Sequence, residues 1–200
     1  MNLAEYEKVK NLTYSEYCDY LQKKYGIGLH DYMTKSWNKN SRCSRTKEGL
    51  VLHHKYEDHA IMLSTKAFAM KNPFEWQQAK NLIYCDYLEH LFLHILICEH
   101  PSANQNKNEA VGIGGIINYI VPELNDLYSG WKTEQEWRKN CHDRVINDKN
   151  VYLTLLKRFK NTCKDYPFYT KDCLFTSFNE IFGLWSCKNN EKLFKEIETL

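Results

Sequence analysis

The sequence predicts a single α+β domain that is predominantly helical, with a small strand–loop–strand–helix core between N-terminal and C-terminal helices. The composition is that of a globular chain, with 43% hydrophobic and 26% charged residues. Two short apolar runs, 49–54 and 82–85, have the length of strands, and residues 86–99 form a strong helix candidate. With only 8 Gly and 4 Pro, long flexible linkers are not expected, so the parts should pack as one globular unit.

The first segment, residues 1–48, is predicted to be helical and then to form a basic loop. Thr13 and Glu16 have the spacing of a capping box, and Tyr17 and Leu21 follow at helical spacing. Residues 35–47 contain five Lys or Arg and no acidic residue, and their Asn and Ser residues indicate a loop.

The last segment, residues 101–200, is predicted to be a helical region packed on the core. Residues 101–108 are polar and break the hydrophobic pattern, which makes them the best internal boundary. Further helices are expected over 110–128, 132–147, 150–163 and 189–199. Pro122 should kink or interrupt the first of these.

The middle segment, residues 49–100, contains six of the eight histidines although it is the most acidic part of the chain. His90 and His94 are four residues apart, so both imidazoles project from one face of the predicted helix. That is the geometry a cation needs from two ligands on one helix. His53 and His54 end the first strand and point to opposite sides, so one of them can face the ion and the other the substrate.

This arrangement resembles the HNH (His-Me finger, ββα-metal) endonucleases. The family pattern is an apolar strand ending in His-His or Asp-His, a variable loop, and Asn-Leu-apolar leading into a helix with HxxxH. The corresponding residues are GLVLHH at 49–54 and NLIYCDYLEHLFLH at 81–94. The resemblance implies an HNH core over residues 49–100 and a metal-dependent nuclease.

The same resemblance implies a role for each motif residue. His53, His90 and His94 correspond to the ligands of one divalent cation, and His54 corresponds to the general base that activates water. Asn81 corresponds to the residue that holds the loop between the strands and so keeps His54 oriented. The all-histidine ligand set is like that of the nuclease colicins.

The chain departs from many family members in lacking a structural zinc site. None of its eight cysteines is spaced as CxxC, and Asp86 and Glu89 stand where cysteine is expected before His90. Asp86 lies one helical turn before His90, so we expect its carboxylate to hydrogen-bond a ligand imidazole from behind. Glu57 and Asp58 follow the predicted base and could touch the site, although a surface loop is the default interpretation.

Hydrolysis of a phosphodiester bond in DNA or RNA suits these residues. A neutral imidazole can take a proton from water near neutral pH, and a divalent cation stabilises charge on the phosphate. Three histidines favour Zn²⁺, Ni²⁺ or Mn²⁺ over Mg²⁺ on affinity, without deciding among the four ions.

Phosphate contacts are expected from the basic loop, because the net charge of only +2 gives no general basic character. Arg42, Arg45 and Lys47 are the candidates, since a guanidinium can bind two phosphate oxygens at once. The alternative is that this loop is simply solvated. Gly112-Ile113-Gly114-Gly115 lacks the Lys-Ser/Thr ending of a phosphate loop and indicates close helix packing instead.

Two other functions fit the same residues. One is a non-catalytic HNH-like module that binds nucleic acid or protein, such as a defence or counter-defence protein of a phage or mobile element. The other is a metal hydrolase of small phosphoesters. In either case the C-terminal helices could dock a protein partner.

The chain is expected to be cytoplasmic and to have no membrane partner. Its start, MNLAEYEKVK, is polar and of mixed charge, unlike a signal peptide. No run of about 18 apolar residues is present. Under these conditions the cysteines should be reduced and mostly buried.

Overall fold

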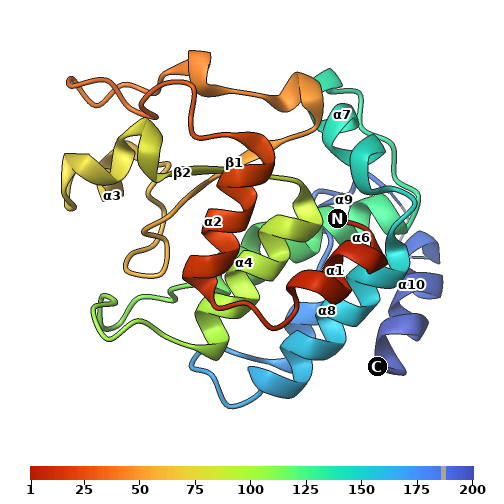
Figure 1. The fold of residues 1–200 in the computed structure, drawn as a ribbon. Coiled ribbons are helices and arrows are strands. Elements are labelled where there is room, and N and C mark those ends of the chain that lie inside the picture. The colour runs from red at the N-terminus through yellow and green to blue at the C-terminus, as the bar shows by residue number, and fades with distance from the viewer. Residues whose placement is uncertain (186–187) are drawn as a thin grey trace.

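Helices surround a two-stranded sheet in the computed structural model, which describes residues 1–185 and 188–200 (Figure 1). The fold is therefore α+β and mainly helical. In chain order the elements are α1 (Leu3–Val9), α2 (Tyr14–Tyr25), β1 (Val51–His54), α3 (Lys66–Ala69), β2 (Leu82–Cys85), α4 (Tyr87–Glu99), α5 (Ile113–Gly115), a π-helical turn (Ile116–Ile120), α6 (Val121–Tyr128), α7 (Glu136–Val145), α8 (Lys149–Thr162), α9 (Phe178–Ile181) and α10 (Lys188–Glu198).

The sheet consists of the two strands that the apolar runs predict. β1 and β2 pair antiparallel, with Val51 opposite Cys85 and His54 opposite Leu82. The long connection between them, residues 55–81, returns over the surface through α3 and two short 3-10 turns. Strand, strand and helix α4 follow one another as the sequence predicts.

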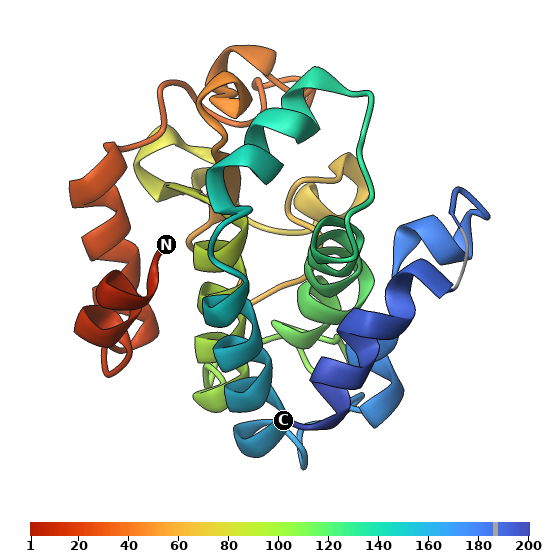
Figure 2. The same cartoon turned by 90° about the vertical axis from the view of Figure 1, so that its right-hand side faces the viewer.

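Helix α4 is the centre of the molecule. Asp86 caps its start: the carboxylate accepts the Glu89 N–H, and the Glu89 side chain accepts the Asp86 N–H. Almost every residue of α4 is buried, as expected for a helix that is apolar on all sides. Helix α2 packs on one side of α4 and α8 on another, and α10 lies farther out beyond α6 (Figures 1 and 2).

The N-terminal segment has the predicted form. Thr13 and Glu16 make both bonds of the capping box at the start of α2, and Gly26 ends the helix at a φ of 84°, which favours glycine. Residues 35–47 contain no strand or α-helix; a short 3-10 turn lies at Ser41–Cys43 and another begins at Thr46 and ends at Glu48.

The C-terminal helices also lie where the periodicity places them. The helix predicted over 110–128 is divided into α5, the π-helical turn and α6. Pro122 is in the first turn of α6. Because proline has no N–H, it cannot donate to the carbonyl of Asn118 one turn earlier. The helical hydrogen-bond pattern changes near this point from π-helical to α-helical.

One buried hydrophobic cluster takes side chains from all three predicted segments, from Tyr17 through Phe92 to Leu193. The seven cysteines in the described residues are free and buried; Cys187 lies outside the described residues. Among the helices of 1–185 and 188–200, none combines the length and apolar character needed to cross a bilayer.

The capping box of α2 makes a simple stability prediction. Thr13→Ala removes the side-chain acceptor of the Glu16 N–H and should lower the free energy of unfolding by about 1 kcal/mol. In a chain of this size that corresponds to a melting temperature roughly 2–4 °C lower. Thr65→Ala is the matched control, because Thr65 precedes α3 without making a cap hydrogen bond. Equal melting temperatures for both variants, measured by circular dichroism, would contradict the assignment.

Candidate metal centre

The end of β1 directs its two histidines to opposite sides. His53 faces α4, with its ring centre 5.3 Å from that of His90 and 5.1 Å from that of His94. His54 faces the other way and packs edge-on against the Tyr32 ring. Both side chains are buried, at 0% and 1% exposed. The strand alternation that the sequence predicts therefore separates their environments.

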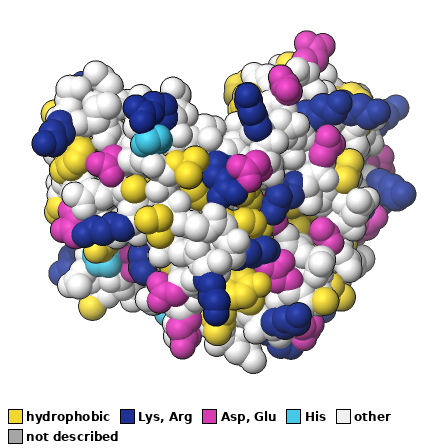
Figure 3. Space-filling view, turned by 45° about the horizontal axis from the view of Figure 1, so that its top comes forward, with side chains coloured by type: hydrophobic (Ala, Val, Ile, Leu, Met, Phe, Trp, Pro, Cys, Tyr) yellow, Lys and Arg dark blue, Asp and Glu magenta, His cyan; other side chains and the backbone are white. Residues whose placement is uncertain are grey.

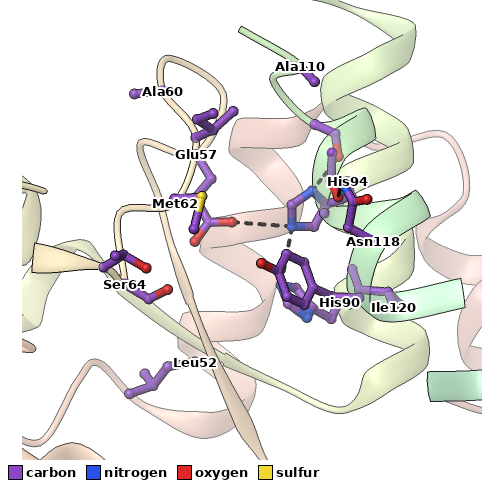
Figure 4. Close-up of a pocket in the computed structure, with 16 residues that line it drawn as sticks. Leu52, Glu57, Ala60, Met62, Ser64, His90, His94, Ala110, Asn118 and Ile120 are labelled. Carbon is purple, nitrogen blue, oxygen red and sulfur yellow. Dashed lines mark hydrogen bonds and ion pairs between the residues drawn. The ribbon is translucent and has the colours of Figure 1, made fainter. Parts of the chain in front are cut away.

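Helix α4 supplies two further imidazoles from successive turns. The Nε2 atoms of His90 and His94 lie 3.2 Å apart, and both rings point toward the turn that follows β1 (Figure 4). The three predicted ligand residues, His53, His90 and His94, thus face a common centre.

Glu57 completes this group. It lies in the turn after β1, where its N–H donates to the His54 carbonyl. Its Oε2 is 3.3 Å from His53 Nδ1 and 3.2 Å from His94 Nε2. The sequence favoured a surface loop for Glu57, because an irregular turn carries no periodic signal. Its place shortly after His53 and His54 was the one indication that it could touch the site.

The tautomer of His53 is set by Tyr14. The Tyr14 hydroxyl donates its hydrogen to the Lys55 carbonyl at 2.9 Å, so at 2.8 Å it accepts from His53 Nε2. With the proton on Nε2, the Nδ1 lone pair points at the carboxylate of Glu57. That Nδ1 atom is fully buried and has no hydrogen-bond partner.

His94 is fixed in the same way from the C-terminal segment. Its Nδ1 donates to the Gly112 carbonyl at 2.8 Å, which leaves the Nε2 lone pair facing His90 and Glu57. A ring N–H donated away from the centre is the usual arrangement behind a histidine that binds metal.

Four candidate ligand atoms therefore meet around one point. The candidate ligand atoms of His53, Glu57, His90 and His94 all lie within 4.8 Å of one another. Ligands bonded at about 2.0–2.1 Å to a tetrahedral cation are about 3.3 Å apart, and the 3.2 and 3.3 Å separations match this spacing. The group could hold a metal ion.

The electrostatics keep these side chains in the forms that bind a cation. Burial, with the neighbouring imidazoles of His94 and His53, holds the pKa of His90 well below its usual range. Burial also lowers the pKa of His53, against the opposing effect of Glu57. Burial would raise the pKa of Glu57, but the charge of a protonated His53 and hydrogen bonds donated by His53, His54 and His94 lower that pKa well below its usual range. Since burial disfavours the charged forms of His53 and His90, shared protons or a cation are needed to hold the Glu57 carboxylate ionised.

His54, predicted as the general base, has both ring nitrogens occupied. Its Nε2 is 3.2 Å from Gln77 Oε1, and the Gln77 amide is oriented by donating to the Leu63 carbonyl. Its Nδ1 is 3.3 Å from Glu57 Oε1. In this arrangement His54 supports Glu57 from the side opposite the other ligands.

Asn81 makes the kind of contact that the motif implies. The side-chain amide of Asn81 donates to the main-chain carbonyl of Glu75, and the main-chain carbonyl of Asn81 accepts the Lys55 N–H. These two bonds tie together both ends of the connection between the strands. Gln77, which contacts His54, lies within the part that Asn81 holds.

Asp86 takes a different position from the one predicted. One carboxylate oxygen accepts the Glu89 N–H and the other forms an ion pair with the Met1 amino group. Since both oxygens are used at the start of α4, Asp86 does not hydrogen-bond a ligand imidazole. Tyr14 and the Gly112 carbonyl hold the ligand rings from behind instead.

The three predicted phosphate-contacting residues are dispersed. Arg45 forms an ion pair with Glu48 and donates to the Tyr25 carbonyl. Arg42 is exposed beside His30, and Lys47 is exposed on the outer surface. Of the three, only Arg45 borders a hollow that reaches His90.

Two glycines allow the C-terminal segment to approach α4. A Cβ on Gly115 would lie 2.3 Å from His94 Cε1, and one on Gly112 would lie 2.7 Å from a methyl group of Ile97. The close packing that the sequence predicts for residues 112–115 is therefore present, and it forms the wall behind His94.

Comparison with known proteins does not identify a family. No family model matches the chain, and no curated protein or solved structure matches it either. The resemblance to HNH nucleases accordingly rests on the motif within residues 49–94.

The assignment of Glu57 as a ligand can be tested by removing its charge. Glu57→Gln should weaken binding of Zn²⁺ or Mn²⁺ at least about tenfold. Removing even a residue that only hydrogen-bonds a metal ligand typically costs that much affinity. Titration calorimetry measures the affinity, and the metal-induced rise in melting temperature gives a second readout. Asp58→Asn is the control, because this neighbouring carboxylate contacts only His59. An unchanged affinity for Glu57→Gln would exclude Glu57 from the site.

The wall behind His94 gives a second test. Gly115→Ala should displace the His94 imidazole and lower metal affinity roughly 10- to 100-fold. Gly114→Ala is the matched control, because its added Cβ would meet Ala110 Cβ at 3.4 Å and Asn118 Nδ2 at 4.0 Å, which are ordinary contacts. If both variants bind metal like the original protein, the contact between residue 115 and His94 does not position the ligand.

Proposed function

We propose that this protein is a metal-dependent nuclease of HNH type, hydrolysing phosphodiester bonds in DNA or RNA. The observation that carries the proposal is the convergence of His53, Glu57, His90 and His94 on one point. These donors come from a strand, the turn after it and the helix that follows β2, which is the order of the HNH motif.

A divalent cation bound by these residues would stabilise charge on the phosphate and on the departing oxygen. The residues themselves form a rigid set of ligands in which Glu57 carries a negative charge. Tyr14 and the Gly112 carbonyl fix two of the imidazoles, so the donors need little reorganisation to bind an ion.

The proposed general base is His54. Its Nε2 donates to the side-chain oxygen of Gln77, so Nδ1 is the nitrogen that can take a proton from water. Nδ1 lies 3.3 Å from Glu57 Oε1, and this contact with Glu57 must open before His54 can act as the base. Hydrogen bonds at catalytic residues commonly rearrange when substrate binds, and the closed contact is compatible with this role.

Four protein donors restrict the choice of ion. They complete a tetrahedral shell, whereas a catalytic ion needs an open position. We therefore propose an ion that accepts more than four ligands, such as Mn²⁺ or Ni²⁺, or Zn²⁺ in its expanded five-coordinate form. The hollow bordered by Glu57, His90 and His94 gives access to that position.

A second candidate function is a non-catalytic module with a structural ion. The closed set of four donors and the 1% exposure of His54 favour it. Such a module would bind nucleic acid or protein without cutting. The two candidates differ in whether the bound ion keeps a position open to solvent.

A cleavage assay tests the nuclease proposal. Plasmid DNA and structured RNA are incubated with the protein and Mn²⁺, Ni²⁺, Zn²⁺ or Mg²⁺, or with a chelator. His90→Ala should lose both metal binding and cutting. His54→Ala should retain metal binding and cut roughly 10²–10⁴-fold more slowly.

His100→Ala is the control, because His100 is exposed at the end of the same helix. Tight metal binding without cutting of either nucleic acid would replace the nuclease by the structural module. Loss of metal binding in His54→Ala would instead make His54 a residue that positions Glu57.

A further inference from the structure

The metal centre borders two adjoining hollows. A pocket of about 410 Å³ and a second hollow of about 770 Å³ share five lining residues, His90 among them, so they lie on either side of those residues. We call them the inner pocket and the outer groove. The shared residues are Leu52, Ser64, His90, Tyr119 and Ile120.

The inner pocket is apolar apart from the metal group. Glu57, His90 and His94 form one wall (Figure 4), and no Lys or Arg lines it. The neutral polar groups at its edge include Ser64 and Asn118. Its volume falls within the roughly 300–1,000 Å³ of small-molecule sites, so it suits a flat, uncharged group rather than a second phosphate.

The outer groove contains few cations. Arg45 is bound to Glu48, which leaves Lys39 as the lining cation without a carboxylate partner among the ion pairs of the described residues. The face drawn in Figure 3 likewise mixes Lys and Arg with Asp and Glu instead of gathering one sign. Binding to duplex DNA depends mainly on many phosphate contacts, and this groove offers few.

Tyr119 stands where the two spaces meet. It belongs to the π-helical turn Ile116–Ile120 and is 56% exposed, which is unusual for an aromatic side chain at the mouth of an apolar pocket. Exposed aromatic rings beside a groove are the platforms on which proteins stack the bases of single strands.

We propose that the inner pocket receives an unpaired nucleobase, which stacks on Tyr119 while its phosphate lies at the metal centre. The strand then continues along the outer groove toward Lys39. The preferred substrate is accordingly single-stranded or locally unpaired nucleic acid, since a paired base must first be unstacked to enter such a pocket. This inference rests on the proposed nuclease function and specifies its substrate.

Fluorescence anisotropy tests the inference. Labelled 12-nucleotide DNA and RNA strands, a duplex of the same sequence, and a strand with abasic positions are titrated with the protein in Mn²⁺, all carrying phosphorothioate linkages that resist hydrolysis. The single strands should bind at least about tenfold more tightly than the duplex or the abasic strand. The DNA and RNA arms show which sugar is preferred.

Variants locate the contact. Tyr119→Ala should weaken single-strand binding about tenfold, and Tyr119→Phe should preserve it because the ring remains. Phe168→Ala is the control, since Phe168 is similarly exposed, at 55%, but lies outside the groove. The abasic strand tests the pocket on the unaltered protein, so the result does not depend on how any variant folds.

Equal binding of duplex and single strand, or of abasic and intact strands, would overturn the inference. The cleavage assay separates this failure from that of the proposed function. Metal-dependent cutting of duplex, with no effect of abasic positions, would retain the nuclease and remove the base pocket. Base-dependent binding of single strands without any cutting would retain the base pocket and remove the nuclease.

Discussion

The structure depends on one electrostatic constraint: three imidazoles and a carboxylate direct candidate ligand atoms at each other in a largely buried space. Lone pairs in such an arrangement repel unless a cation or protons lie between them. The lone pair of His53 Nδ1 cannot be turned away, because Tyr14 fixes the proton on Nε2. His94 is held similarly by Gly112. The fold therefore maintains a cluster whose stability is coupled to what occupies it.

This constraint explains why the centre needs all three segments of the chain. Tyr14 comes from the N-terminal helices, the ligands come from the strand and helix core, and the Gly112 carbonyl comes from the C-terminal half. Gly115 lets that half approach the His94 ring closely. The C-terminal helices are thus part of the site's support, and not only a cover for the hydrophobic core.

The sequence predicted the parts of the site that regular structure carries. Period and spacing located both strands, helix α4 and its histidine pair, because each repeats a pattern along the chain. Glu57 was not predicted as a ligand, because an irregular turn has no period and a surface loop was the default interpretation. Asp86 was misplaced for a related reason: helical spacing put it beside His90, but a residue at the N-cap turns its carboxylate back to the helix N–H groups. Arg45 was expected to be free, yet Glu48 three residues later neutralises it.

The two candidate functions differ in whether the connection between β1 and β2, residues 55–81, opens when substrate binds. It supplies Glu57, which completes the ligand set and lies 3.3 Å from His54 Nδ1, and Gln77, whose side-chain oxygen accepts from His54 Nε2. A single displacement of this connection would therefore both open a coordination position and free the base, whereas Asn81 ties its end in place through the Glu75 carbonyl. Catalysis requires that this connection opens when substrate binds, and a structural role requires that it stays closed. Because the two changes share one segment, they are coupled, and the same motion would govern access to the ion and proton transfer.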